Sequence, residues 1–435
     1  MIVFEAKLQG TDNQYQALDE ALRTARFVRN SCLRYWIDNI GVGRYDLNKY
    51  CAVLAQEFEW AKKLNSMARQ ASAERAWSAI ARFFDNCKKG IPGKKGFPRF
   101  KKEQTHQSVE YKTTGWKLSE SRLEITFTDG FEAGTFKMWG TRDLHYYQIE
   151  QIKRVRVVRR ADGYYTQFCI DQERVETHEL TGKNIGIDVG LNHFLTDSDG
   201  NTVENPRFLR KDEKALKIAQ RCVSRKKKGS KNRVKACNRL GRKHLKLQRQ
   251  RKDFVVKTAR ALVQSSDLIA IEDLKVRNMV RRVRSCRLAS ESNSPVKNHH
   301  LAKSISDAAW SQFREWLEYF GKIFGVPVIA ISPYYTSQDC SNCGVEVKKT
   351  LSTRTHACPR CNHVQDRDRN AAVNILKKAL QQLAKTTEGH SESHNACGET
   401  DLCFVGVTQP SKPTQRNRKL KEQSLESPSS TTVRE

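Results

Sequence analysis

Four cysteines arranged as two Cys-x-x-Cys pairs give the clearest chemical signal in the chain. The first pair is Cys340 and Cys343, and fourteen residues separate it from the second pair. The second pair is Cys358 and Cys361. Four thiolates are the ligand set of a closed tetrahedral zinc site, and the separation is only slightly shorter than the usual range of about 15–20 residues. We therefore predict one structural Zn²⁺ bound by these four residues.

Three carboxylates stand where one expected element ends or the next begins. Asp188 and Glu272 each follow an apolar strand, so both should lie at the carboxyl edge of one sheet. Asp368 lies at the start of a helix expected over 370–380, where the helix dipole favours negative charge. Three converging carboxylates can hold two divalent ions about 3.5–4 Å apart, and Mg²⁺ prefers oxygen ligands. These residues predict a metal-dependent site for phosphodiester cleavage.

Two neighbouring acids compete for these roles. Asp273 directly follows Glu272, but successive strand residues face opposite sides of a sheet, and this alternation favours Glu272. Asp366 lies two residues before Asp368, and the pattern alone does not separate them. Each acid taken singly is more readily explained as a turn or cap residue. The prediction therefore depends on all three acids occurring in one domain.

The chain is strongly basic. Its 435 residues include 78 Lys and Arg against 48 Asp and Glu, which gives a formal net charge of +30. Such a charge favours a polyanionic partner, and nucleic acid is the leading candidate. The basic run at 221–257 contains a single acid, Asp253. Phosphate contacts are predicted for Lys226, Lys227, Lys228, Lys231, Arg233, Arg242 and Lys243. The alternative is a solvated charged surface.

The cysteine usage and the apolar runs predict the cellular compartment. The 13 cysteines are an odd number, and four of them belong to the predicted zinc site, which suits a reducing environment better than a disulfide framework. The first ten residues lack the pattern of a signal peptide, and the longest apolar runs are too short to cross a bilayer. We expect a cytoplasmic, nucleoid-associated prokaryotic protein without a membrane partner.

The sequence predicts five regions along the chain, and the residues described above must be positioned by this framework. A strand at 1–10 and strands within 90–180 flank helical periodicity at 11–89, which indicates a β-barrel with a helical insert. Four tryptophans of this half are expected in its core: Trp36, Trp60, Trp77 and Trp116.

The second half alternates strands with helices at 181–336 and 364–385, which is typical of an α/β domain with a partly parallel sheet. The zinc ribbon at 337–363 interrupts it. We expect a loop at 281–300 and one amphipathic helix between 305 and 324. Residues 386–435 are rich in Ser, Thr, Glu and Lys and are expected to be disordered.

Several segments of the chain resemble the TnpB family of transposon-encoded RNA-guided nucleases, which are related to the type V CRISPR effectors. These segments are Gly-Ile-Asp-Val-Gly-Leu at 186–191, Ile-Glu-Asp-Leu at 271–274, Tyr-Thr-Ser-Gln-Asp-Cys-Ser-Asn-Cys-Gly at 335–344 and Asp-Arg-Asp-Arg-Asn-Ala-Ala-Val-Asn-Ile at 366–375. The segments at 96–101 and 304–310 resemble the family as well, and the likeness runs in order from about residue 1 to residue 380.

The resemblance implies a RuvC-like nuclease domain with the RNase H fold, interrupted by the zinc ribbon. It also implies an N-terminal wedge-type β-barrel that carries a helical recognition insert. In the family pattern the third acid is the Asp of Asp-x-Asn, which here is Asp368. The family binds a transposon-derived guide RNA and cleaves matching double-stranded DNA beside a short adjacent motif, with base pairing supplying sequence specificity.

Three other functions fit parts of the pattern. A catalytically silent RNA-guided repressor would be expected to lack at least one of the three acids, and none is missing here. A strand-transfer transposase would carry its acids in the order Asp-Asp-Glu, whereas this chain has Asp188, Glu272 and Asp368. A plain zinc-ribbon nucleic-acid-binding protein would leave Asp188 and Glu272 unexplained. An RNA-guided endonuclease is therefore the leading hypothesis.

Overall fold

The structure is a computed structural model that describes residues 1–102, 108–140, 143–280, 299–350 and 353–388. Residues 1–383 group together as one unit. Of the loop expected at 281–300, residues 281–298 lie outside the described residues, as does the expected disordered tail beyond residue 388. No helix in the described ranges is long and apolar enough to span a membrane.

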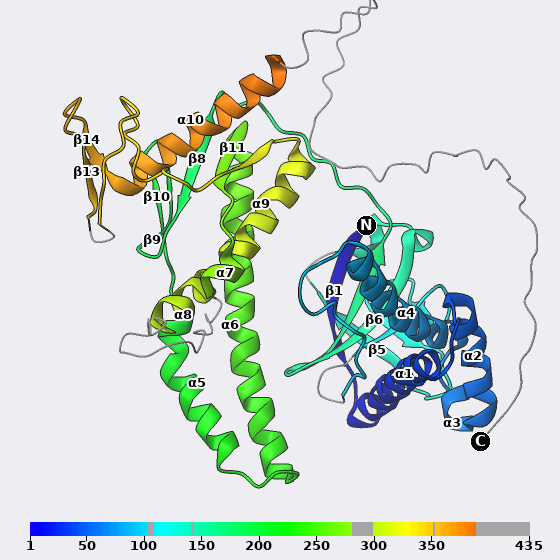
Figure 1. The fold of residues 1–435 in the computed structure, drawn as a ribbon. Helices are drawn as coiled ribbons and strands as arrows, with labels where there is room; N and C mark the ends of the chain where they lie inside the picture. Colours follow the sequence, from blue (N-terminus) through cyan, green and yellow to red (C-terminus); the bar gives the residue numbers. More distant parts are fainter. Residues whose placement is uncertain (103–107, 141–142, 281–298, 351–352, 389–435) are drawn as a thin grey trace, which may run out of the picture. The chain divides into compact units, whose positions relative to one another are not determined.

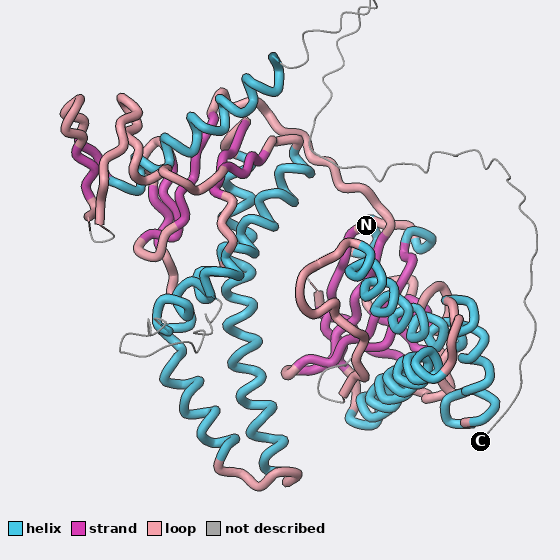
Figure 2. The backbone as a smooth tube through the Cα atoms, in the orientation of Figure 1, coloured by secondary structure: helices cyan, strands magenta, loops and turns pink. Residues whose placement is uncertain are grey.

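The N-terminal half contains a seven-stranded antiparallel sheet that forms a half-barrel, with strand order β2-β6-β7-β1-β5-β4-β3 (Figure 2). Its strands are β1 (Ile2–Gln9), β2 (Ser108–Tyr111), β3 (Trp116–Leu118), β4 (Glu124–Phe127), β5 (Gly134–Trp139), β6 (Ile152–Arg160) and β7 (Gly163–Ile170). Every second residue of β1 from Phe4 onward is buried, namely Phe4, Ala6 and Leu8. This period of two orients one face of the sheet toward the core.

Four helices lie between β1 and β2 in the chain, within the predicted range 11–89. They are α1 (Asp12–Asp38), α2 (Arg44–Glu57), α3 (Glu59–Lys62) and α4 (Ser66–Lys88). The expectation of a tryptophan core was wrong for Trp60, whose side chain is 44% exposed, while Trp116 is buried. Trp60 packs against Phe27 and Phe58 at the surface of the helices.

The second half is built around a five-stranded sheet with strand order β10-β9-β8-β11-β12 (Figure 1). Its strands are β8 (Asn184–Val189), β9 (His193–Asp197), β10 (Thr202–Glu204), β11 (Leu268–Glu272) and β12 (Val328–Ile331). Strands β8, β11 and β12 are parallel, and Ile187 pairs in register with Ile271. Asp188 and Glu272 follow these paired residues, so they lie at the same edge of the sheet.

Helices cover both faces of this sheet. They are α5 (Phe208–Ser224), α6 (Lys231–Gln264), α7 (Val276–Val280), α8 (His299–Ala308), α9 (Trp310–Phe324) and α10 (Arg367–Glu388). Ile269 and Ile271 of β11 pack in a core with residues of α6 and α9, whereas Ala270 packs with Ile375 and Ala379 of α10. The alternation along β11 therefore separates an α6/α9 face from an α10 face.

The contact between β8 and α10 is a backbone contact. A Cβ atom at Gly186 would lie 2.1 Å from the carbonyl oxygen of Ala372 and 2.7 Å from the amide nitrogen of Leu376. Because no side chain fits at these distances, glycine at this position allows α10 to lie directly on the strand.

The single helix expected between 305 and 324 is two helices. Ala309, between α8 and α9, has a left-handed backbone conformation with φ 58°, and this conformation ends one helix and starts the next. Ile305 and Trp310, on either side of the break, are buried in the same core. The apolar periodicity predicted the burial correctly, but no Gly or Pro marks the break in the sequence.

Candidate metal centres

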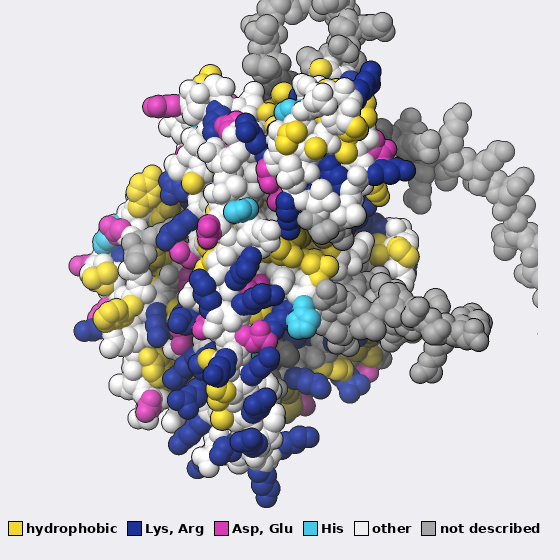
Figure 3. Space-filling model, turned by 90° about the vertical axis from the view of Figure 1, so that its left-hand side faces the viewer, with side chains coloured by type: hydrophobic (Ala, Val, Ile, Leu, Met, Phe, Trp, Pro, Cys, Tyr) yellow, Lys and Arg dark blue, Asp and Glu magenta, His cyan; other side chains and the backbone are white. Residues whose placement is uncertain are grey.

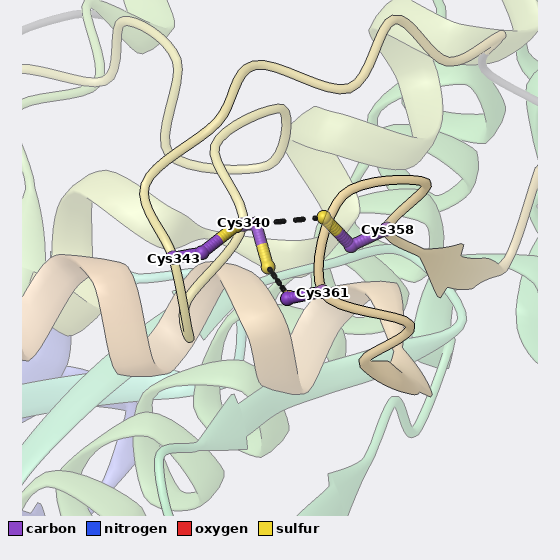
Figure 4. Close-up of side chains that lie close together, drawn as sticks. All are labelled: Cys340, Cys343, Cys358 and Cys361. Atoms are coloured by element: carbon purple, nitrogen blue, oxygen red, sulfur yellow. Dashed lines mark hydrogen bonds between the residues drawn. The ribbon is translucent and has the colours of Figure 1, made fainter.

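The four predicted zinc ligands meet at one point (Figure 4). Their sulfur atoms all lie within 4.8 Å of one another, with Sγ–Sγ distances of 3.6 Å between Cys340 and Cys361 and 3.5 Å between Cys343 and Cys358. These distances exclude a disulfide, whose sulfurs are about 2.05 Å apart. Zn–S bonds of about 2.3 Å place the sulfurs of a tetrahedral site about 3.8 Å apart, so the cluster fits Zn²⁺. Within the described ranges it is the only such group of His, Cys, Asp or Glu residues.

Each Cys-x-x-Cys pair is closed by the same type of turn. The residue after the second cysteine, Gly344 or Asn362, has positive φ, and its amide donates to the carbonyl of the first cysteine of its pair. The backbone amide of His363 lowers the pKa of Cys361 to about 6. The thiolate is the form that binds metal, so this backbone contact favours Cys361 as a metal ligand. The β13 (Thr355–Ala357) and β14 (Val364–Asp366) strands flank the second pair and are antiparallel to each other, and β14 leads directly into α10.

The three predicted catalytic acids lie around the α10 face of the sheet. Asp188 is two residues beyond Gly186, and Glu272 is two residues beyond Ala270, so both share the face on which α10 packs. Asp368 is in the first turn of α10. Asp188 is half-buried and Glu272 is buried. The fold therefore brings together three elements that are far apart in the sequence.

The electrostatics of these acids favour a cation. Burial, followed by the charges of Glu272 and Asp368, raises the pKa of Asp188 well above its ordinary value. Burial also raises the pKa of Glu272. The carboxylate oxygens do not meet as closely as the four sulfurs do. A set of hard oxygen donors whose negative charges repel one another fits a divalent ion such as Mg²⁺.

The competing acids have other partners. The Asp366 carboxylate accepts the backbone amides of Asp368 at 2.8 Å and Arg369 at 3.1 Å, so it caps the N-terminus of α10. Asp273 is about half exposed and pairs with Arg314, which lowers its pKa. The alternation of faces that favours Glu272 in the sequence is thus present in the fold.

Sequence reasoning missed several residues that contact these acids. Arg354 lies 3.5 Å and Arg367 3.1 Å from the carboxylate oxygens of Asp368. The Thr336 hydroxyl donates to Glu272 Oε1 at 2.6 Å. Thr336 belongs to the segment 335–344 that resembles the family, but nothing in its residue type indicated a contact with a residue 64 positions away.

The basic residues chosen from the sequence fall into two groups. Lys226, Lys227, Lys228 and Lys231 are exposed at the connection between α5 and α6, where Lys and Arg side chains gather in the lower part of Figure 3. Arg233 instead donates from Nη1 to the carbonyls of Val223 at 2.8 Å and Lys226 at 3.0 Å, which joins the two helices. Arg242 donates to the carbonyl of Ala161, and Lys243 is half-buried. The four lysines are therefore the better candidates for phosphate contacts.

Replacing these four lysines with Ala is expected to weaken nucleic-acid binding and to flatten its salt dependence. Each lysine that contacts a phosphate contributes about one unit to the slope of log K against log salt concentration, because its binding releases counterions. Fluorescence anisotropy over a salt series measures the slope. Replacing the same lysines with Arg keeps the charge and is the matched control. An unaltered slope in the Ala variant would indicate that these lysines are solvated surface residues and do not contact phosphate.

Comparison with known proteins identifies the family. Residues 167–283 match the OrfB_IS605 family, described as "Probable transposase", and residues 310–375 match the "Cas12f1-like, TNB domain". A protein of Streptomyces pristinaespiralis named "Putative RNA-guided DNA endonuclease" is 30% identical over 87% of this chain and 89% of its own length. The chain belongs to the TnpB/OrfB_IS605 family.

One further relative is similar in sequence to this TnpB/OrfB_IS605 member, and one solved structure is similar in fold. "Putative RNA-guided DNA endonuclease InsQ" of Escherichia coli (strain K12) is 29% identical over 76% of this chain and 78% of its own length. The Cas12f1 chain of a Cas12f1–sgRNA–target DNA complex superposes with a TM-score of 0.51 at 14% identity, over 84% of this chain and 83% of that chain. The four-cysteine cluster lies within the segment that matches the TNB domain.

Proposed function

We propose that the protein is an RNA-guided, divalent-metal-dependent DNA endonuclease that cleaves double-stranded DNA matching a bound, transposon-derived guide RNA next to a short adjacent motif. The observation that carries the proposal is the convergence of Asp188, Glu272 and Asp368 on one face of a sheet in a member of this family. The repulsion among these acids would be relieved by bound cations. The names of the relatives from Streptomyces and Escherichia coli support the same activity.

The proposed nuclease domain is RuvC-like with the RNase H fold. Support comes from the strand order β10-β9-β8-β11-β12, in which β10, β9 and β8 are antiparallel and β8, β11 and β12 are parallel. The proposed boundaries are 181–336 and 364–385, with the zinc ribbon at 337–363. The half-barrel and its four inserted helices would be the wedge-type and recognition parts.

In the proposed mechanism Asp188, Glu272 and Asp368 would hold two Mg²⁺ ions, and this metal would supply water activation and charge stabilisation at the leaving oxygen of the phosphodiester. Asp188 and Glu272 extend from paired parallel strands, so their backbones hold a fixed separation. Asp368 approaches from α10, while Arg354 and Arg367 balance part of its charge. The single Zn²⁺ would be structural and would fix the chain between β12 and α10.

The guide RNA and the target DNA are the proposed partners, and base pairing between them would supply sequence specificity. The exposed lysines at the connection of α5 and α6 would contact the phosphate backbone. A cytoplasmic, nucleoid-associated location in a prokaryote follows from this activity and agrees with the bacterial relatives.

The test is to express the gene with its native downstream DNA, purify the protein and sequence the nucleic acid that accompanies it. We expect one discrete RNA that ends in sequence from beyond the gene. The complex carrying that RNA should cleave matching DNA only when Mg²⁺ is present. Expression without the downstream DNA is the matched control and should yield protein that lacks this RNA.

Other outcomes separate the alternative functions. A discrete RNA with target binding but no cleavage would indicate a guide-directed repressor. Random fragments, or no RNA, would contradict guided cleavage and favour a strand-transfer transposase or a general nucleic-acid-binding protein.

A further inference from the structure

A buried hydroxyl contacts one of the proposed metal ligands. Thr336, in the irregular segment between β12 and Cys340, is 3% exposed, and its Oγ1 donates to Glu272 Oε1 at 2.6 Å. The same oxygen lies 3.2 Å from the carbonyl of Pro333. A hydroxyl has one proton to donate, and the shorter contact to a carboxylate is the stronger one. The proton therefore belongs to the contact with Glu272.

This contact fixes one oxygen of the buried Glu272 side chain. Within the described parts of the chain, Thr336 is the only hydrogen-bond donor to the Glu272 carboxylate. A glutamate has three side-chain torsions, and ordering it opposes metal binding unless another contact has already done so. Because Oε1 is held by the hydroxyl, Oε2 remains available to a cation.

The Thr336 segment is in turn held by α10. Asn374 Nδ2 donates to the carbonyls of Thr336 at 2.9 Å and Asp339 at 2.7 Å. One helical turn earlier, Asn370 donates to the carbonyl of Asp339 at 2.8 Å and accepts from the amide of Ser341 at 2.9 Å. Both asparagines are buried, since Asn370 is 0% exposed and Asn374 is 6% exposed. Buried amides with satisfied partners hold a segment firmly, because breaking one hydrogen bond leaves a buried polar group without a partner.

The same helix carries Asp368 two residues before Asn370. The network therefore runs from the helix of one proposed metal ligand, through the Thr336 backbone and hydroxyl, to the carboxylate of another. Ser341 also places the network directly beside Cys340, the first cysteine of the zinc cluster.

We propose that Thr336 and Asn374 are positioning residues, which fix the Glu272 carboxylate relative to Asp368 before a metal binds. The inference rests on the proposed function, since it assigns Glu272 to the metal site. Residues that orient metal ligands typically contribute about 10–100-fold to metal affinity or activity. The effect of Thr336 should therefore fall on metal binding, while the fold and the zinc cluster stay intact.

The experiment compares Thr336→Val, which keeps the shape but removes the hydroxyl, with Thr336→Ser, which keeps the hydroxyl. Mn²⁺ binding to the purified RNA complex is measured by EPR titration, and the Mg²⁺ concentration for half-maximal cleavage is measured in parallel. We expect the Val variant to bind Mn²⁺ about 10–100-fold more weakly and the Ser variant to restore binding. Zinc content and melting temperature should match those of the unmodified protein. Unchanged Mn²⁺ binding in the Val variant would overturn the proposal.

Glu272→Gln separates this inference from the proposed function. If Thr336 acts through Glu272, adding Thr336→Val to Glu272→Gln should cause no further loss of Mn²⁺ binding. A further loss would contradict the proposal. If Glu272→Gln leaves both Mn²⁺ binding and cleavage unchanged, the assignment of Glu272 to the metal site itself is wrong.

Asn374→Ala provides a second route should Thr336→Val fail to fold. It removes the two amide contacts that hold the segment but leaves the Thr336 hydroxyl in place. We expect weaker Mn²⁺ binding at unchanged zinc content. Loss of zinc together with loss of Mn²⁺ binding would show that Asn374 only supports the ribbon and would overturn its positioning role.

Discussion

Replacing Asp188 with Ala is expected to abolish DNA cleavage, with a rate lower by about 10³-fold or more. A carboxylate that holds catalytic metal contributes several kcal/mol to transition-state stabilisation, and each 1.4 kcal/mol or so corresponds to about tenfold in rate. The rate is measured with the RNA-loaded complex under single-turnover conditions at saturating Mg²⁺. RNA and DNA binding should be largely unchanged, because Asp188 lies on the α10 face of the sheet and not in the basic run.

The melting temperature of the Asp188→Asn variant, measured in the metal-free protein, shows whether the fold is intact. The pKa of Asp188 is raised by burial and by the neighbouring acids, so its ionised form destabilises the folded state. The stability that the protonated form provides is lost as the pH rises through the raised pKa. At neutral pH we therefore expect the Asn variant to have a higher melting temperature than the unmodified protein, and this difference should shrink toward low pH. If Asp188→Ala loses RNA and DNA binding as well as cleavage, Asp188 has a structural role.

Neighbouring acids supply matched controls for the other two positions. Glu272→Gln should abolish cleavage, whereas Asp273→Asn should not, because the Asp273 carboxylate is already paired with Arg314. Asp368→Asn should likewise abolish cleavage. Asp366→Asn should be tolerated, since Asn caps a helix about as well as Asp. Equal losses from both members of a pair would contradict the assignment.

Replacing Cys358 with Ser is expected to remove the bound zinc and to unfold the ribbon locally. Structural zinc sites in small domains have apparent binding free energies on the order of 10 kcal/mol, and their folding depends on the metal. We expect zinc content, measured by mass spectrometry of the metal, to fall from one ion per chain to nearly none. Cleavage should also be lost, because the segment tied to Asn370 and Asn374 on α10 includes Cys340 of this cluster.

Cys222→Ser is the control, because Cys222 is an exposed cysteine of α5 outside the cluster. Its zinc content and activity should be unchanged. If Cys358→Ser keeps one zinc ion per chain, the four-thiolate assignment is wrong.

Features that depend on local residue spacing could be predicted from the sequence. The two Cys-x-x-Cys pairs predicted the sulfur cluster, because each pair is one short turn and the ligands of one metal must converge. The apolar strands that precede Asp188 and Glu272 predicted their common edge, because parallel strands end on the same side. The choice of Glu272 over Asp273 followed from the alternation of a strand, and the ion pair of Asp273 with Arg314 agrees with it.

Features that depend on tertiary contacts could not be predicted from the sequence. The helix break at Ala309 carries no Gly or Pro, and the left-handed backbone there is held by burial of the residues around it. Arg233 looks like its basic neighbours in the sequence, yet it joins α5 to α6 through two carbonyls. The contact of Thr336 with Glu272 depends on how α10 places the segment before the ribbon. None of these contacts is encoded in residue type or spacing.

Gly186 limits how the sequence and structure of this protein can vary. Because β8 and α10 meet there through main-chain atoms, the gap between the strand of Asp188 and the helix of Asp368 is already at its minimum. Repacking side chains elsewhere in the domain cannot narrow it, and any larger residue at 186 can only widen it. Evolution or protein engineering can therefore vary the loops, the ribbon and the basic surface widely, while the spacing between these two acids keeps a lower bound set by the thickness of the backbone itself.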